Sequence, residues 1–287
     1  MRTMPTILLI ALLILFGCGQ SGDPGAGVND LSKIVQSAPE KEGMVFIRGG
    51  EFTFTLFDES KSVLVNSFYL DLCPVTIADF AEFVEATGYV PLSDNPDHKA
   101  VYLKELDSLA PHYQRFFANT TVARKSGITW RHDERGNLRD SSDWRFYPVV
   151  HVSLDDARAY ARWRGKRLPN MYEWQYAALT GMELEDYSDR IEENVWHAGN
   201  SEVIMPVGIG VPNARGIYDL IGNINEYVEQ GDYRFSYEGV PDSSRISIYS
   251  VSSFINEVKQ LYPPSFFLAS RGVPGYDTGF RCAMDVR

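Results

Sequence analysis

The sequence predicts an α+β domain, because three helices with clear start signals lie among short and scattered strands. At each helix start a side-chain hydrogen-bond acceptor is followed three residues later by a carboxylate, which is the pattern of a capping box. Helices joined to short strands by long irregular connections are typical of α+β domains and not of a regular parallel sheet. The three acceptor and carboxylate pairs are Thr76 with Asp79, Ser153 with Asp156, and Asn170 with Glu173.

Each predicted helix carries one apolar face and is followed by a glycine. Glycine suits the left-handed backbone conformation that ends many helices. The apolar faces and following glycines are Phe80, Phe83, Val84 and Gly88 in the first helix, Ala157, Tyr160, Ala161 and Gly165 in the second, and Trp174, Ala177, Ala178 and Gly181 in the third.

Short runs rich in β-branched and aromatic residues predict the strands. The pair Gly49-Gly50 separates the first two runs, so we expect a hairpin turn there. The predicted strands are residues 44–47, 51–56, 67–70, 246–250 and 279–284.

The predicted domain occupies residues 43–287 without a second domain boundary or an internal repeat. Residues 94–146 are polar and aromatic with weak periodicity, and we expect them to form a surface excursion between the first two helices. The chain has a net charge of −11 at pH 7, which argues against a nucleic-acid surface, since phosphate binding needs a basic stripe.

The N-terminus predicts a secretion signal with a lipid attachment site. Arg2 supplies positive charge, and residues 7–16 form an apolar run too short to span a bilayer. The sequence LFGC that ends at Cys18 resembles a bacterial lipobox, with the cysteine acylated after cleavage. An ordinary cleaved signal peptide is the alternative.

Residues 1–18 are therefore the predicted lipoprotein signal. Residues 19–42 are rich in glycine, serine, proline and charge, and their composition predicts a flexible tether. We expect the chain to contact a membrane through the lipid on Cys18, on the periplasmic or cell-surface side of a bacterial membrane.

Ordered sequence blocks across roughly residues 44–287 resemble the family of the formylglycine-generating enzyme, the sulfatase-modifying factors. The resemblance implies a C-type-lectin-like fold with much irregular structure. The blocks read MVFIRGGEFTF, FYLDLCPVTIADFAEFV, YPVVHVSLDDARAYARWRGKRLPNMYEWQYAALTG, NVWHAGNSE, PVGIGVPNARGIYDLIGNINEY and GFRC.

The octet DLIGNINE, residues 219–226, matches the calcium-binding segment of that family. The resemblance implies four ligands: the Asp219 and Glu226 carboxylates and the Gly222 and Ile224 carbonyls. Calcium accepts such a mixture of carboxylate and carbonyl oxygens. The alternative is a plain Gly-Asn turn whose Glu226 caps backbone amides.

A second calcium site occurs in some family members, and Asn200-Ser201 could supply its first half. No acidic residue stands where the second half requires one. We therefore expect one structural calcium ion and not two.

Formylglycine-generating members bind copper through two cysteines five positions apart, because Cu(I) is a soft cation that prefers thiolates. Aligned on Arg271 and the GFRC block, these positions fall near Pro263 and Leu268, which cannot bind copper. The glycine-rich block that precedes them in the family is replaced by Tyr249-Ser250-Val251-Ser252-Ser253-Phe254. Copper is therefore not expected.

Cys73 and Cys282 are the two cysteines that remain after lipidation of Cys18. Lectin-like folds bring the first helix and the last strand together, and the periplasm is oxidising, so we expect a Cys73–Cys282 disulfide. Two separate buried thiols are the alternative, and a metal site is a more distant one.

No catalytic residue is assigned from the sequence. The five histidines lack metal-binding spacing, and we expect His151 to be a buried structural residue. No nucleophile-elbow context supports a serine hydrolase.

We therefore expect a lipid-anchored protein with a formylglycine-generating-enzyme-like domain that acts as a non-catalytic binding or assembly factor. Its partner would be a protein or peptide ligand. One alternative is an oxidoreductase or maturation enzyme that uses non-cysteine residues of the same groove. A further alternative is a carbohydrate-binding, lectin-like module.

Overall fold

The computed structural model describes residues 40–56, 59–103, 122–179, 194–232, 246–261 and 264–286. The chain divides into Met1–Ala38 and Pro39–Arg287, and every described residue belongs to the second unit. The predicted signal, Cys18 and nearly all of the tether lie outside the described residues. Among the helices that the structure describes, none has the length and apolar composition needed to cross a bilayer.

The three predicted helices are confirmed as α2 (Ile77–Thr87), α3 (Leu154–Trp163) and α4 (Met171–Leu179). All three capping boxes form, with each N-cap side chain accepting a hydrogen bond from the backbone N–H three residues later. Gly88 ends α2 in the left-handed conformation as predicted. By contrast, the C-cap of α3 is Arg164 in the right-handed conformation, and Gly165 follows it. Gly181 lies outside the described residues.

The strands of the described residues form two main sheets and two separate ribbons. One sheet has the order β1-β4-β11, and the other has the order β10-β7-β8-β9. The ribbons are β2-β3 and β5-β6. The bounds are β1 Met44–Ile47, β2 Gly50–Leu56, β3 Glu59–Val65, β4 Phe68–Asp71, β5 Lys99–Leu103, β6 Val122–Ser126, β7 Asn225–Val228, β8 Ile246–Ser250, β9 Phe266–Ser270, β10 Thr278–Gly279 and β11 Ala283–Asp285, with two short helical turns at Leu92–Asp94 and α6 (Val258–Leu261).

The predicted hairpin at Gly49-Gly50 is wrong. β1 pairs with β4, and β2 pairs with β3, so the two strands that flank the glycines do not pair with each other. A Cβ on Gly49 would lie 2.2 Å from the Val65 carbonyl oxygen. The glycine is therefore needed for close approach of two chain segments and not for a hairpin turn.

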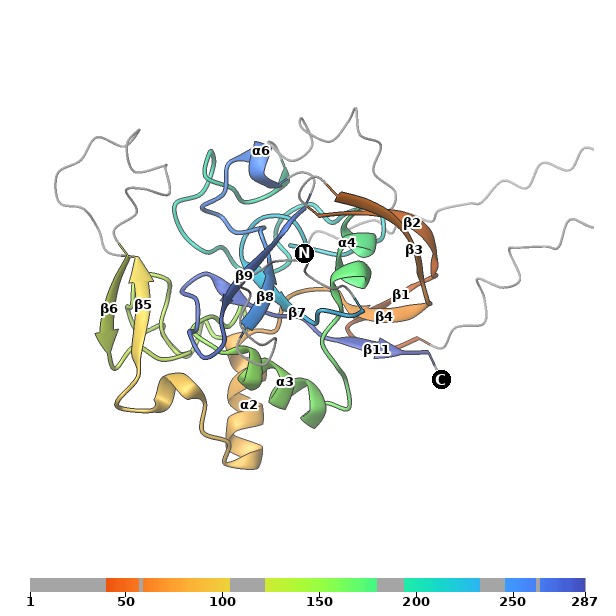
Figure 1. Cartoon of the computed structure of the whole chain (residues 1–287). Coiled ribbons are helices and arrows are strands. Elements are labelled where there is room, and N and C mark those ends of the chain that lie inside the picture. The colour runs from red at the N-terminus through yellow and green to blue at the C-terminus, as the bar shows by residue number, and fades with distance from the viewer. Residues whose placement is uncertain are drawn as a thin grey trace, which may run out of the picture. The chain divides into compact units, whose positions relative to one another are not determined.

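The predicted strand at residues 279–284 is divided into β10 and β11. β10 pairs in parallel with β7, whereas β11 pairs antiparallel with β4. The residues between them are buried and carry the Arg281 side chain into the interior. The C-terminal segment thus joins the two main sheets (Figure 1).

The surface excursion predicted for residues 94–146 is only partly correct. Its strands β5 and β6 form a ribbon drawn at one side of the domain in Figure 1. However, Trp130 is 1% exposed and packs against Phe80 of α2 with ring centroids 5.3 Å apart. This segment therefore contributes to the core as well as to the surface.

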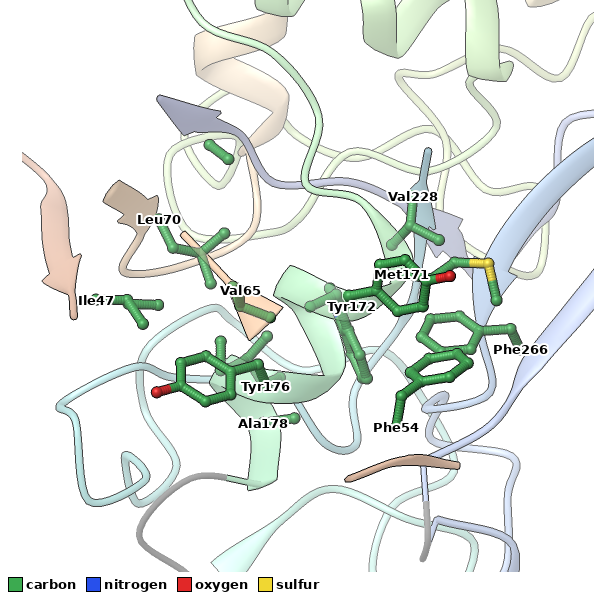
Figure 2. Close-up of a cluster of buried hydrophobic side chains, with 14 of the residues drawn as sticks. Ile47, Phe54, Val65, Leu70, Met171, Tyr172, Tyr176, Ala178, Val228 and Phe266 are labelled. Carbon is green, nitrogen blue, oxygen red and sulfur yellow. The ribbon is translucent and has the colours of Figure 1, made fainter. Parts of the chain in front are cut away.

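Two apolar clusters make up most of the core. The first surrounds α4, and Figure 2 shows Phe54 of β2 beside Phe266 of β9, with ring centroids 6.1 Å apart. The second lies between α2 and α3, where Phe80 and Tyr160 both contact Phe280. Chain segments far apart in sequence thus meet in both clusters.

Candidate functional site

The octet 219–226 is a tight turn that leads into β7. Asp219, Gly222 and Asn223 all have positive φ, at 54°, 85° and 66°. The Asn223 N–H donates to the Trp196 carbonyl at 2.9 Å, and a Cβ on Gly222 would lie 2.6 Å from that same carbonyl oxygen. Gly222 is required here because the turn packs directly against another backbone segment.

Glu226 and Arg281 form an ion pair at the centre of the domain, and both side chains are 0% exposed. Arg281 Nη2 lies 2.7 Å from Glu226 Oε1, and Arg281 Nε lies 2.9 Å from each carboxylate oxygen. Trp174 Nε1 of α4 donates to Glu226 Oε2 at 2.8 Å. Each oxygen of this carboxylate therefore accepts more than one hydrogen bond.

The remaining N–H groups of Arg281 donate to backbone carbonyls. Nη1 donates to Asp71 and Leu72 at 3.1 and 3.3 Å, and Nη2 donates to Tyr218 at 2.8 Å. A guanidinium has five N–H donors, and here each has an acceptor. Arg281 thus connects β4, the octet and the C-terminal segment without an unsatisfied group.

The residues of the octet do not fit a calcium ion as they stand. Glu226 is fully engaged by Arg281 and Trp174, and the positive guanidinium is next to the carboxylate that the ion would need. The Ile224 carbonyl accepts the Ser252 hydroxyl at 3.1 Å. A dication beside Arg281 would be repelled by it, and binding would require this buried pair to separate.

Asp219, the other predicted carboxylate ligand, fixes a neighbouring loop. Its Oδ2 accepts the backbone N–H of Gly208 at 2.8 Å. Burial raises the pKa of Asp219, while the Gly208 hydrogen bond and the charge of Arg281 oppose that increase. Asp219 therefore orders the chain around Gly208, a role that its position in the octet did not predict.

Asn200, where the sequence predicted that a second calcium site is absent, makes hydrogen bonds to residues close to it in sequence. Its side-chain oxygen accepts the His197 N–H at 3.0 Å, and its amide donates to the Val195 carbonyl at 2.8 Å. These bonds close a turn next to the octet.

The position aligned with one family cysteine is Leu268 in β9, and the other, Pro263, lies outside the described residues. Leu268 pairs with Ile248 of β8 and packs against the first apolar cluster. A leucine here adds apolar contact and offers no metal ligand.

Cys73 and Cys282 are free thiols in the structure, which corrects the predicted disulfide. Cys282 lies in the second apolar cluster, whereas Cys73 lies near Gly208 and the charges of Arg281 and Asp219. Adjacent residues of an extended chain point to opposite sides, so Cys282 points away from the Arg281 side that Cys73 shares. Burial raises the pKa of Cys73 to about 11 and raises the pKa of Cys282 well above its usual value.

A buried polar cluster, which the sequence did not predict, occupies the segment that replaces the family's glycine-rich block. The Ser252 N–H donates to Asn225 Oδ1 at 2.9 Å, and Asn225 Nδ2 donates to Asp277 Oδ2 at 3.1 Å. Ser253 and Thr278 also bond to the Asp277 carboxylate, and burial raises its pKa. These bonds fasten the segment that follows β8, and the segment that leads into β10, to the octet.

An aromatic row crosses the sheet beside this cluster. Tyr249 of β8 pairs with Tyr227 on one side and with Phe267 of β9 on the other. The Tyr249 and Phe267 rings stack at 5.9 Å, and Phe267 is 54% exposed. The row therefore runs from the core to the surface on the strand that contains Leu268.

His151 is buried, as predicted, and has a positive φ of 57°. Its Nε2 lies 2.8 Å from the Asp133 carbonyl oxygen, while Nδ1 has no hydrogen-bond partner. Burial lowers the pKa of His151 to about 4. The ring is therefore neutral at physiological pH.

Comparison with protein families matches residues 31–286 to the sulfatase-modifying factor enzyme 1-like domain. The chain is 27% identical over 282 residues to the formylglycine-generating enzyme of Mus musculus, covering 84% of this chain and 75% of that enzyme. It is 32% identical over 189 residues to the inactive C-alpha-formylglycine-generating enzyme 2 of Bos taurus, covering 58% and 61%.

Among solved structures, PvdO from Pseudomonas aeruginosa is similar, with a TM-score of 0.57 and 20% identity. The similarity covers 84% of this chain and 94% of PvdO. It supports the predicted α+β architecture at the level of the fold.

Proposed function

This chain belongs to the sulfatase-modifying factor enzyme 1-like domain family, and we propose that it is a non-catalytic binding or assembly factor of the bacterial envelope. A lipid on Cys18 would anchor it to the membrane. The domain would then act by contact with a protein or peptide partner and would not generate formylglycine.

The state of the cysteines carries this proposal. Copper chemistry of the family type needs two neighbouring thiolates. The sequence has three cysteines, Cys18 is assigned to the lipid, and Leu268 stands at an aligned cysteine position. Cys73 and Cys282 have raised pKa values, so both are protonated at neutral pH and face different surroundings.

Two further observations support a binding role. The bovine relative that is named an inactive formylglycine-generating enzyme is 32% identical to this chain, so non-catalytic domains exist within the family. In addition, Phe267 is 54% exposed on β9, beside the Leu268 position. An exposed aromatic ring stacked on Tyr249 offers a contact surface to a partner.

An oxidation assay tests the catalytic half of the proposal. The full chain is incubated with copper, oxygen, a reductant and a cysteine-containing sulfatase-motif peptide, and the peptide is then weighed by mass spectrometry. We expect no aldehyde beyond a copper-only control. Formation of aldehyde by the wild-type chain that is lost in a Cys73→Ala/Cys282→Ala double variant would refute the proposal.

A pull-down from detergent-solubilised membranes tests the binding half. The bait is the full lipoprotein, and the matched control is Phe267→Ser, which changes an exposed side chain. We expect a protein that is retained by wild type and reduced with the variant.

Metabolic labelling with a fatty acid tests the lipid anchor separately. We expect the wild-type chain to be labelled and the Cys18→Ser variant to remain unlabelled, and an unlabelled wild-type chain would refute this part of the proposal.

A further inference from the structure

Residues 208–211, with the sequence GIGV, place Ile209 and Val211 outward and the two glycines inward. Ile209 and Val211 are 55% and 57% exposed. A Cβ on Gly208 would lie 3.2 Å from Cys73 Sγ, and one on Gly210 would lie 3.6 Å from Trp196 Nε1. This alternation is the reverse of that in an ordinary surface segment, where the apolar residues face the core.

Phe146 lies on the loop beside this segment and is also exposed. The Val207 N–H donates to the Phe146 carbonyl at 2.7 Å, which sets the two loops side by side, and the Phe146 ring is 43% exposed. The Arg145 guanidinium lies 4.5 Å from the centre of that ring. We call Phe146, Ile209 and Val211 the apolar ridge.

The ridge is held outward by bonds from the interior. Asn223 bonds to Met205 twice, through Met205 N–H to Oδ1 at 2.9 Å and through Nδ2 to the Met205 carbonyl at 3.1 Å. Asp219 accepts the Gly208 N–H, as described above. Because buried side chains fix the backbone at these points, Ile209 and Val211 cannot turn inward without breaking those bonds.

We propose that the apolar ridge inserts shallowly into the phospholipid bilayer to which the lipid on Cys18 attaches the chain. This inference rests on the lipid anchor of the proposed function. Only 25 residues separate Cys18 from Met44 at the start of β1. A flexible chain of that length has a root-mean-square end-to-end distance of about 25–30 Å, so the domain stays close to the membrane surface.

The size of the ridge favours a membrane over a protein partner. A standard protein interface buries about 800 Å² on each partner, which three partly exposed side chains do not supply. A tethered contact needs far less affinity, because a short tether gives an effective concentration of about millimolar. Aromatic and aliphatic side chains beside an arginine are also typical of segments that lie in the membrane interface.

Charge indicates which kind of lipid contact to expect. The chain carries a net charge of −11, and anionic lipids would therefore repel it as a whole. Insertion must then come from the apolar side chains. We expect the contact to form on uncharged phosphatidylcholine surfaces and to resist added salt, since apolar burial is not screened.

The test measures the depth of a reporter tryptophan with brominated phosphatidylcholine, which quenches fluorescence inside the bilayer. The full lipoprotein carrying Ile209→Trp is reconstituted in such vesicles and compared with Val90→Trp. Val90 is 71% exposed and follows the C-terminal end of α2. The N-terminal end of the same helix lies close to the ridge, because the Ala78 N–H donates to the carbonyl of Trp144, two residues before Phe146. Both variants change exposed residues, and an unchanged melting temperature verifies that each one folds.

We expect several-fold stronger added quenching for Ile209→Trp than for Val90→Trp, unchanged in high salt. A Val211→Ser change in the Ile209→Trp chain should reduce it. Equal quenching at the two positions, or quenching abolished by salt, would overturn the proposal. A parallel preparation with Cys18→Ser and an N-terminal histidine tag on nickel-chelating lipid distinguishes failure of the ridge from failure of acylation.

Discussion

Two neighbouring parts of the domain distribute their side chains against the usual preference, and in opposite directions. The centre buries the charged pair Glu226 and Arg281 completely, whereas the apolar ridge exposes more than half of Ile209 and Val211. The Asp219–Gly208 hydrogen bond joins the two parts. The buried charges have every partner they need inside the molecule, while Ile209 and Val211 leave more than half of their apolar surface uncovered. The centre therefore explains stability, and the ridge indicates a contact outside the chain.

The largest expected effect comes from breaking the centre on one side. Arg281→Met leaves the Glu226 carboxylate buried without its counter-ion, which should cost about 3–5 kcal/mol of unfolding free energy. Urea denaturation followed by circular dichroism measures this loss. The matched control is Arg271→Met, which removes an exposed ion pair with Asp155 and should cost about 1 kcal/mol or less.

A second variant keeps that test decisive if Arg281→Met does not fold. The double variant Arg281→Met/Glu226→Gln removes both charges, and Trp174 can still donate to the amide oxygen. We expect it to recover part of the lost stability, because no unpaired charge remains. A double variant less stable than Arg281→Met would contradict the assignment of the pair.

Acid should destabilise the domain through His151, which is as buried as the central pair but uncharged. Its pKa is about 4 in the folded state, against 6.5 when exposed. Between these two pH values the unfolded chain binds more protons than the folded chain, so the free energy of unfolding falls as pH decreases. The total loss across the window is about 3 kcal/mol. Asp133, His132 and His98 surround the ring and set part of this shift.

Denaturation curves at several pH values between 4 and 7 measure this contribution. His151→Asn tolerates the positive φ and cannot titrate, so its stability should depend less on pH over that window. An equally steep decrease in wild type and variant would assign the acid sensitivity to other groups.

A smaller effect is expected from substituting the inward glycines that lie next to the ridge residues in sequence. Gly208→Ala places a Cβ 3.2 Å from Cys73 Sγ at a φ of 72°, and we expect a loss of about 1–2 kcal/mol. Gly127→Ala has a φ of 83° with nothing within 4 Å, so it measures backbone strain alone. If thermal unfolding shows no greater loss for Gly208→Ala, contact with Cys73 does not require glycine there.

The smallest expected effect is that of calcium. Because Arg281 and Trp174 engage Glu226, the melting temperature should be the same in millimolar calcium and in chelator. A bound ion at a hundred times its dissociation constant would add about 2.7 kcal/mol, which is readily measured. Calcium-dependent stabilisation that disappears in Asp219→Asn would show that the ion displaces the arginine.

The helices were predictable because their signals are local. A capping box needs only two residues three positions apart, and the pairs at Thr76, Ser153 and Asn170 all form. Strand pairing depends on distant partners. Gly49-Gly50 has the composition of a turn, yet Gly49 packs under the Val65 carbonyl, and this contact is not visible in the local sequence.

In the candidate site, the position of the octet was predictable from the sequence, but the roles of its residues were not. The Gly222-Asn223 dipeptide predicted a tight turn correctly, because both residues have positive φ, whereas the family resemblance predicted a calcium site at the same octet. It did not reveal that Glu226 bonds to a residue 55 positions later. The signal available in the sequence was Arg281 itself, in the GFRC block. Its burial and its pairing with Glu226 became visible only in the structure.

The bonds of Arg281 to Asp71 and Leu72, in the first part of the folded domain, also constrain the order of folding. Arg281 donates to the Asp71 carbonyl 210 residues upstream, and β11 completes the sheet that β1 and β4 begin. Until the last residues are available, Glu226 lacks its counter-ion and the first sheet lacks an edge. Contacts with such long sequence separation slow folding. A chain that lacks residues 281–285 should therefore remain more sensitive to proteases than the complete domain.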